Sequence, residues 1–214
     1  MKLRHWLIFL CLLGFAAPRA AAQEVGIKTN LLGWAVTNPN LGVEIGVGHR
    51  STISLTGAVN PWNFSDNRHL RSWIAMPEYR YWFCEKFTGH FIGVHLLGGE
   101  YNAKNVNFPL KSLIVASSVT PVYPDDPASA QKGWPDMTSP ANKDRHVEGW
   151  FGGAGVTYGY QWMLSRHWNL EASIGVGYAY SKMHLYGRCS RTIDKRTLHY
   201  VGPTHANVSF MYLF

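Results

Sequence analysis

The residues most able to do chemistry are charged side chains that alternate with aromatic ones. In "PEYRYWF", residues 77–83, Glu78 and Arg80 alternate with tyrosines and a phenylalanine. A period of two indicates a strand with one charged face and one aromatic face. The same placement recurs in other segments and defines a set of five charges: Lys28, Glu44, Glu78, Arg80 and Glu171. If these charged faces share one interior, the charges must meet there.

Charges enclosed in a protein interior are costly unless they pair. We therefore expect these five residues to form a network of salt bridges that plugs the interior and has a structural role. A path for protons or ions is the alternative interpretation. An open pore is disfavoured, because the interior of a small barrel is filled by side chains.

Nucleophilic chemistry would need a serine, a histidine and an acid within reach of one another. The only His-x-Ser stretch, His49 to Ser51, falls in a short predicted turn. His95 and His205 are expected in the wall of the fold, and the sequence places no serine clearly beside either. No cluster has metal-ligand spacing, and "GAGVTYG" is interpreted as a face of small residues rather than a phosphate loop. The sequence thus predicts no catalytic residue, no cofactor and no metal.

The elements that must position these charges are strands. Alternation appears eight times, in segments of about 10 residues or more, and helical periodicity is nearly absent. It is clearest at 168–181 and 150–162, where large apolar residues face one side and Gly, Ser, Thr and Asn face the other. It is weaker at 26–36 and 89–102. The pattern predicts an all-β fold, an eight-stranded antiparallel up-and-down barrel.

Two kinds of barrel fit such strands. A soluble, lipocalin-like carrier turns its apolar face inward, whereas a transmembrane barrel turns it toward lipid. The small polar face suits a narrow interior and carries little charge for a water-facing surface. We therefore expect a transmembrane β-barrel, with the soluble carrier as the less favoured alternative.

Aromatic residues support this orientation, because they gather near strand ends on the apolar face, as at a membrane interface. One predicted belt contains Tyr81, Phe83, Tyr160, Trp162, Trp168 and Tyr212, and the other contains Trp73, Trp150, Tyr178 and Tyr180. The terminal residues resemble the C-terminal assembly signal of bacterial outer-membrane barrels: Phe210, Tyr212 and Phe214.

Connection lengths give the orientation. Short turns are predicted near 49–51, 84–88 and 164–167, and they alternate with longer connections near 60–70, 104–147 and 184–199 and a short first connection at 37–40. Outer-membrane barrels have short periplasmic turns and long extracellular loops. Both termini are thus expected in the periplasm, with an irregular extracellular loop at about 104–147. Pro77 is expected to cause a bulge or a local kink.

The last predicted loop is basic and contains Arg188, Arg191, Lys195 and Arg196. It could contact the phosphates of lipopolysaccharide or acidic glycans, or it could be an ordinary solvated loop.

The N-terminus has the features of an export signal. A basic start precedes an apolar run too short to span a membrane, and small residues follow. Cleavage after Ala22 would leave residues 23–214 as one barrel domain and lower the net charge from +7 to about +4, because the signal carries Lys2, Arg4 and Arg19. Cys84 and Cys189 are expected at opposite ends of the barrel, beyond disulfide reach.

Three stretches carry a family resemblance: "KTNLL" (28–32), "PEYRYWF" (77–83) and "GYQWMLSRHWNLEASIGVGYAY" (159–180). They resemble the Bacteroidota-type exported barrels classed as domain of unknown function 3575. The resemblance implies an outer-membrane barrel and a link to fimbria or appendage assembly. We expect a non-enzymatic barrel with a structural or surface-interaction role, such as adhesion. Expected partners are outer-membrane lipid and lipopolysaccharide, the barrel-assembly machinery and an envelope or appendage protein, not nucleic acid. The alternative function is a lipid A-modifying enzyme.

Overall fold

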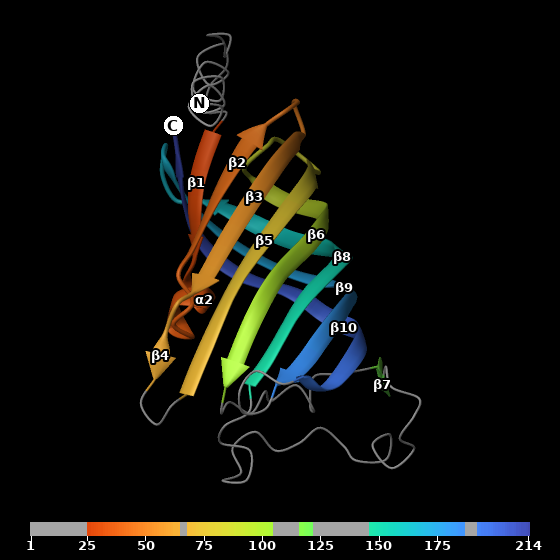
Figure 1. Ribbon diagram of the computed structural model, residues 1–214. Helices are drawn as coiled ribbons and strands as arrows, with labels where there is room; N and C mark the ends of the chain where they lie inside the picture. The colour runs from red at the N-terminus through yellow and green to blue at the C-terminus, as the bar shows by residue number, and fades with distance from the viewer. Residues whose placement is uncertain (1–24, 65–67, 105–115, 122–145, 187–191) are drawn as a thin grey trace, which may run out of the picture.

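The computed structural model describes residues 25–64, 68–104, 116–121, 146–186 and 192–214 (Figure 1). The predicted export signal, residues 1–22, lies outside these ranges. The described elements are β1 (Val25–Asn30), α2 (Leu31–Ala35), β2 (Asn40–Gly46), β3 (Ser51–Asn60), β4 (Asn63–Phe64), β5 (Arg68–Trp82), β6 (Gly89–Lys104), β7 (Ala116–Pro121), β8 (His146–Met163), β9 (Trp168–Tyr186) and β10 (Thr192–Leu213).

Eight antiparallel strands of one sheet close into a ring (Figure 1). Neighbours follow the order β1, β2, β3, β5, β6, β8, β9 and β10, and β10 pairs with β1 to complete the circuit. Two further strands lie on this ring, since β4 pairs with β5 and β7 pairs with β10. The predicted all-β class and the eight antiparallel strands are confirmed.

The two faces of the sheet have opposite chemistry. In β8, Val156 is 57 % exposed and points out of the ring, whereas the next residue, Thr157, is 3 % exposed and points inward. The same alternation along the other strands exposes Val, Ile, Leu, Tyr and Trp on the outer wall and buries Glu, Arg, Lys, Asn and Ser inside. The ring is therefore apolar outside, and its buried charged and polar side chains lie inside.

The short connections and the two ends of the ring lie together. The turns at 47–50, 83–88 and 164–167 join neighbouring strands at the end where β1 begins and β10 finishes (Figure 1). At this end, the Phe214 N–H donates to the Val25 carbonyl and the Leu213 N–H donates to the His167 carbonyl. The strand ends that the longer connections join lie at the opposite end, as the connection lengths predicted.

The strand predicted over 26–36 is shorter than expected, because it ends at Asn30 and is followed by the one-turn helix α2. The Asn30 side chain caps this helix by accepting the Leu32 N–H at 3.0 Å. The same side chain donates to the Ala206 carbonyl and accepts the Val208 N–H, so it bridges β1 to β10 where regular pairing stops. Capping residues compete with strand pairing in this way, and the connection to β2 therefore starts at 31 instead of 37.

The long connections are also more regular than predicted. Residues 184–199 were expected to form a loop, but β9 continues to Tyr186 and β10 begins at Thr192, with their backbones paired from this end onward. Within 104–147, β7 pairs with β10. The ladder continues because β9 and β10 extend each other's edges, and a backbone pairing of this kind does not require an apolar pattern.

Pro77 does not cause a bulge. It stays in register with Leu55 of β3, and the ladder to β6 keeps the same register on both sides of an unpaired step at 76–77. Register shifts occur in β10, between Thr192 and Asp194 and between Pro203 and His205. Pro77 and Pro203 both lack a backbone donor, but only at Pro203 is an extra residue inserted beside the proline.

None of the described helices is long and apolar enough to cross a membrane. Cys84 is an exposed free thiol, and Cys189 lies outside the described residues.

We predict that Asn30→Ala lowers the free energy of unfolding by about 1–2 kcal/mol, because it removes the cap and both bridges to β10. The measurement is a urea titration followed by tryptophan fluorescence. Asn38→Ala is the matched control, since the Asn38 side-chain oxygen has no partner among the described residues. Its effect should stay within about 0.5 kcal/mol. Equal losses for the two variants would contradict the bridging role of Asn30.

Candidate functional site

The five predicted charges meet inside the ring, with Arg80 at the centre. Its guanidinium contacts three carboxylates: Nη1 and Nη2 donate to Glu171 at 2.7 and 3.0 Å, Nη1 donates to Glu44 at 2.9 Å, and Nε donates to Glu78 at 2.7 Å. A fifth contact joins Nη2 to Glu78 at 2.6 Å. These contacts use the full set of five guanidinium N–H groups. Arg80 thereby links β5 to β2 and to β9 across the interior.

Lys28 extends the network to β1. Its Nζ lies 2.7 Å from Glu44 Oε2 and 3.6 Å from Glu171 Oε2. Three residues outside the predicted set also donate to these carboxylates: Thr52 to Glu44 at 2.6 Å, and Asn207 and Ser173 to Glu171 at 2.7 and 3.1 Å. Sequence alternation places all three on the inward face, but it does not reveal which charge each contacts.

The network is not electrically balanced. Three carboxylates face two permanent cations, which leaves a formal charge of −1. The Glu78 Oε1 atom is buried and has no hydrogen-bond partner among the described residues. The neighbouring residue on β3, Ser54, likewise has a buried hydroxyl without a partner there. The side of the network toward β3 is therefore the least satisfied.

An apolar plug lies between the network and the short turns. Trp82 is fully buried, and its ring centroid lies 4.8 Å from that of Phe91 and 6.2 Å from that of Phe87. Phe87 also packs with Met211 and Leu213. Phe91 in turn stacks under the Arg80 guanidinium, whose Cζ lies 4.4 Å from the ring centroid, a cation–π contact. The plug closes this end of the interior.

Two histidines predicted to lie in the wall point into the interior. The His95 ring lies between the Thr157 and Thr204 hydroxyls, at 2.8 and 2.9 Å. A Cβ at Gly155 would lie 2.7 Å from His95 Nε2, so the small residues of β8 make room for this ring. His205 Nε2 lies 3.1 Å from Ser173 Oγ. The sequence had placed no serine with either histidine, and this expectation was wrong for His205.

The Ser173–His205 contact does not form a nucleophilic relay. The Ser173 hydroxyl donates its proton directly to Glu171 Oε1 at 3.1 Å. His205 must then donate to the serine oxygen, because a hydroxyl carries one proton. In a relay the histidine accepts that proton and the acid orients the histidine. Here the acid contacts the serine and Arg80, so the three groups act as a hydrogen-bonded cluster.

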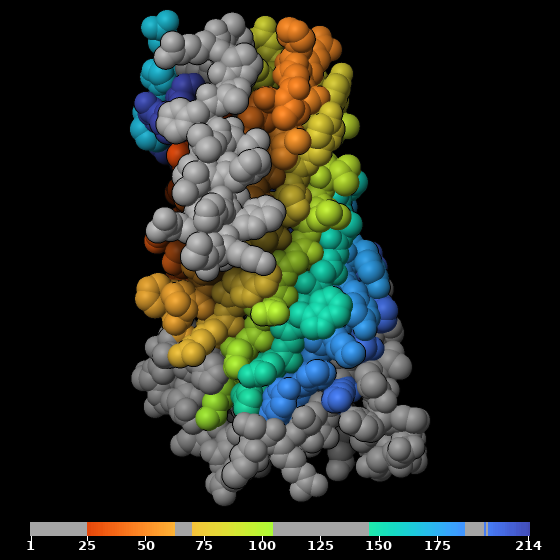
Figure 2. Space-filling model, turned by 45° about the horizontal axis from the view of Figure 1, so that its top comes forward, coloured from red at the N-terminus to blue at the C-terminus, as the bar shows by residue number. Residues whose placement is uncertain are grey.

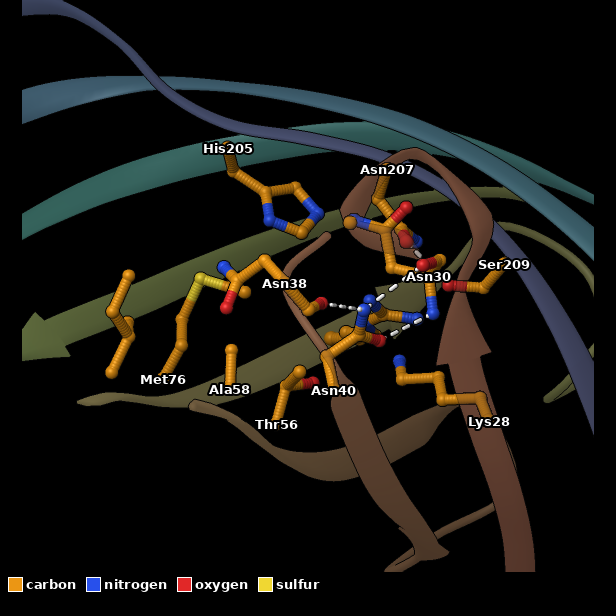
Figure 3. Close-up of a pocket in the computed structure, with 13 residues that line it drawn as sticks. Lys28, Asn30, Asn38, Asn40, Thr56, Ala58, Met76, His205, Asn207 and Ser209 are labelled. Atoms are coloured by element: carbon orange, nitrogen blue, oxygen red, sulfur yellow. Dashed lines mark hydrogen bonds between the residues drawn. The ribbon is translucent and has the colours of Figure 1, made fainter. Parts of the chain in front are cut away.

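A cavity of about 120 Å³ lies beside the network, under the turn that follows α2 (Figure 3). Its polar lining includes Lys28, Asn38, Asn40 and His205, and its apolar lining includes Met76. Asn40 donates to the Asn38 and Asn30 carbonyls, and these contacts shape the cavity wall (Figure 3). The volume suits a few water molecules.

The predicted aromatic residues lie on the outer wall at two levels. The level nearest the short turns contains Tyr81, Phe83, Tyr160, Trp162, Trp168 and Tyr212, and the level nearest the long connections contains Trp73, Trp150, Tyr178 and Tyr180. At the first level Trp168 contacts Phe210 and Tyr212, with ring centroids 4.8 and 4.9 Å apart, and Tyr212 contacts Phe214. The terminal aromatics are thus part of the wall.

The predicted basic loop is not a loop where the structure describes it. Lys195 and Arg196 lie in β10, since their backbones pair with His184 and Met183 of β9. Arg188 and Arg191 lie outside the described residues. Of the four basic residues expected on one loop, two therefore lie in strand β10, and the other two lie outside the described residues.

The chemistry of the site is that of a polar core held by ion pairs and hydrogen bonds, with buried atoms of Glu78 and Ser54 that have no partner among the described residues. Within the described ranges, no group of three or more His, Cys, Asp or Glu residues has the arrangement needed to hold a metal ion. The arrangement joins strands and fills the interior. The features not accounted for by this role are the extra negative charge and the small cavity.

We predict that Arg80→Met destabilises the fold by about 3–5 kcal/mol, because it leaves three buried carboxylates with Lys28 as their nearest cation. Unfolding in guanidinium chloride gives the measurement. Arg50→Met is the control: Arg50 is an exposed turn residue, and its replacement should change stability by no more than about 0.5 kcal/mol. A loss below about 1 kcal/mol for Arg80→Met would show that the network contributes little.

Comparison with known proteins agrees with the motifs noted in the sequence. A family model described as "Protein of unknown function (DUF3575)" matches residues 6–214. Among curated proteins, none matches the chain. The family match includes every described strand and both sides of the charge network. The chain therefore belongs to the family of proteins of unknown function DUF3575.

Proposed function

We propose that this protein is a small β-barrel that spans the bacterial outer membrane, with a structural or surface-interaction role. The observation that supports this best is the sidedness of the ring, with branched and aromatic side chains exposed outside and charges buried inside. Water would oppose that arrangement, since contiguous exposed apolar surface is limited on soluble proteins. Lipid favours it.

The height of the apolar wall agrees with a bilayer. Trp150 and Trp162 stand 12 residues apart on β8, and Trp168 and Tyr180 stand 12 apart on β9. At about 3.3 Å per residue and a tilt near 45°, these pairs are about 28 Å apart along the membrane normal. Transmembrane barrels have an apolar band of about 25 Å between two aromatic girdles.

The orientation follows from the ends of the ring. Outer-membrane barrels turn their short connections to the periplasm. The short turns at 47–50, 83–88 and 164–167 and both ends of the ring would then be periplasmic, and the segment between β6 and β8 would be extracellular. In this orientation Phe210, Tyr212 and Phe214 are available to the barrel-assembly machinery on the periplasmic side.

The filled interior supports a structural role over transport. The plug around Trp82 and the network around Arg80 occupy successive layers of the ring. Side chains that fill an eight-stranded barrel leave no aqueous channel. The protein would therefore act through its outer wall and its extracellular connections, as an adhesion component or a partner in appendage assembly. Crosslinking in cells, followed by capture of the barrel, tests for that partner.

A lipid A-modifying enzyme is the second candidate, and the contact between Ser173 and His205 is the observation that favours it. The direction of the serine hydrogen bond argues against it, as does the enclosure of the pair within the ring. Overexpression should leave the acyl pattern of lipid A unchanged by mass spectrometry. A changed pattern that Ser173→Ala abolishes would favour the enzyme.

We predict that an arginine on the outer wall is costly only at mid-height. Val156 and Leu164 are both 57 % exposed, but Val156 lies midway between the aromatic levels and Leu164 lies in a turn. In lipid vesicles, Val156→Arg should cost about 2–4 kcal/mol and Leu164→Arg about 0–1 kcal/mol. Water would make both substitutions nearly neutral.

Two simpler measurements come before the folding free energies of these variants are measured in vesicles. The protein should sediment with outer membranes, and its gel mobility should change on heating, as folded barrels do. Release of the chain in soluble form, or equal small costs for Val156→Arg and Leu164→Arg, would overturn the transmembrane assignment.

A further inference from the structure

A groove crosses the outer wall near the long connections. One side of it is a row of cross-strand neighbours on β5, β6, β8 and β9, since Trp73 pairs with Glu100, Glu100 with Trp150, and Trp150 with Lys182. Trp73 and Trp150 are each about half exposed. They stand two strands apart, about 10 Å, with the Glu100 carboxylate between them.

The other side of the groove is the next outward row. Arg71 pairs with Asn102, Asn102 with Glu148, and Glu148 with His184. Residues between the two rows, such as Tyr101 and Gly149, form the floor, and the groove has a volume of about 710 Å³. The strands that carry it lie side by side on the face seen in Figure 2.

The acidic groups of the groove already have donors. The Trp73 indole N–H donates to Glu100 at 3.2 Å. Glu148 accepts from Asn102 at 2.6 Å and lies 3.7 Å from His146.

The basic groups flank these acids. Lys182 forms no ion pair with another described residue, and Arg71, which has an interaction of its own, lies at the opposite side of the groove. The groove thus offers a positive charge on each side, with two indoles beside it.

A depression in the apolar wall adjoins the groove. The row on its membrane side consists of small residues, in the order Gly57, Ala75, Gly98 and Gly152. A Cβ built on Gly57 would meet nothing within 4 Å, and one on Gly98 would meet a single backbone oxygen at 3.8 Å. The wall is therefore low where an acyl chain descending from the groove would lie.

We propose that this surface binds an outer-leaflet lipid with a phosphorylated headgroup, a proposal that rests on the transmembrane assignment. The phosphate contacts Lys182 and Arg71, the headgroup lies between the indoles of Trp73 and Trp150, and an acyl chain covers the small-residue row. Arginine and lysine are the usual partners of phosphate, and indoles are favoured at the membrane interface.

A lipid fits the site better than a soluble phosphate does. A free anion would use the basic side chains alone, and nothing in its chemistry would fill the apolar depression. A lipid fits both the groove and the depression, because its charged headgroup would lie in the groove while its acyl chain lies in the depression on the membrane side. Burial of the small-residue row then contributes to binding by the hydrophobic effect.

The test uses the full-length barrel folded in dodecyl maltoside micelles that contain lipid A, with bound lipid counted by native mass spectrometry. The groove variant carries Arg71→Gln and Lys182→Gln. The control variant carries Arg50→Gln and Arg166→Gln at the short-turn end, so both lose two positive charges. Each charge near a lipid phosphate contributes about fivefold in affinity. The groove variant should therefore retain lipid A about twenty-fivefold more weakly, and the control should match the original chain.

Two further measurements separate the possible outcomes. Gly57→Leu fills the depression without changing charge and should also weaken retention, while inorganic phosphate at millimolar concentration should not displace the lipid. Equal retention by the groove and control variants would overturn the lipid site. The heat-dependent gel shift is recorded for every variant, so a folded barrel that fails to bind lipid is distinguished from a chain that does not form a membrane barrel.

Discussion

The contact of one guanidinium with three carboxylates governs the rest of this structure. Arg80 joins strands that are distant in sequence, and its planar group has a fixed donor geometry that lysine cannot reproduce. A one-residue slip of β5 would turn Arg80 outward and bring Tyr81 into the interior. The network thus specifies register, which is the best-supported role for buried charges whose desolvation offsets much of their attraction.

Sequence alternation was sufficient to predict this network because each of its charges lies in a regular part of a strand. It was insufficient where the period changes. His205 follows the register shift at Pro203, so an uninterrupted alternation misplaces the part of β10 on one side of it. Asn30 ends β1 through three side-chain hydrogen bonds, and such contacts leave no mark on a hydrophobic pattern.

The basic residues of β10 illustrate a different limit. Charged, turn-rich composition predicted a loop around Lys195, yet the backbone there pairs with β9. Strand formation at the end of a sheet depends on the neighbouring edge more than on the side chains. The same reason explains why β7 could not be predicted: its pairing with β10 satisfies an edge that β1, only six residues long, leaves open.

The interior and the outer wall share one cause, since both are fixed by which residues face each other across strands. Small residues inside make room for Phe91 and His95, and small residues outside align into the row that includes Gly57 and Gly98. The inner small residues include neighbours on β8, but the outer row is not visible in any single strand, because its members come from β3, β5, β6 and β8. Strand register therefore determines where side chains fill the interior and where small residues leave a depression in the outer wall. A barrel with a filled interior can gain specificity only on that outer surface and at its rims.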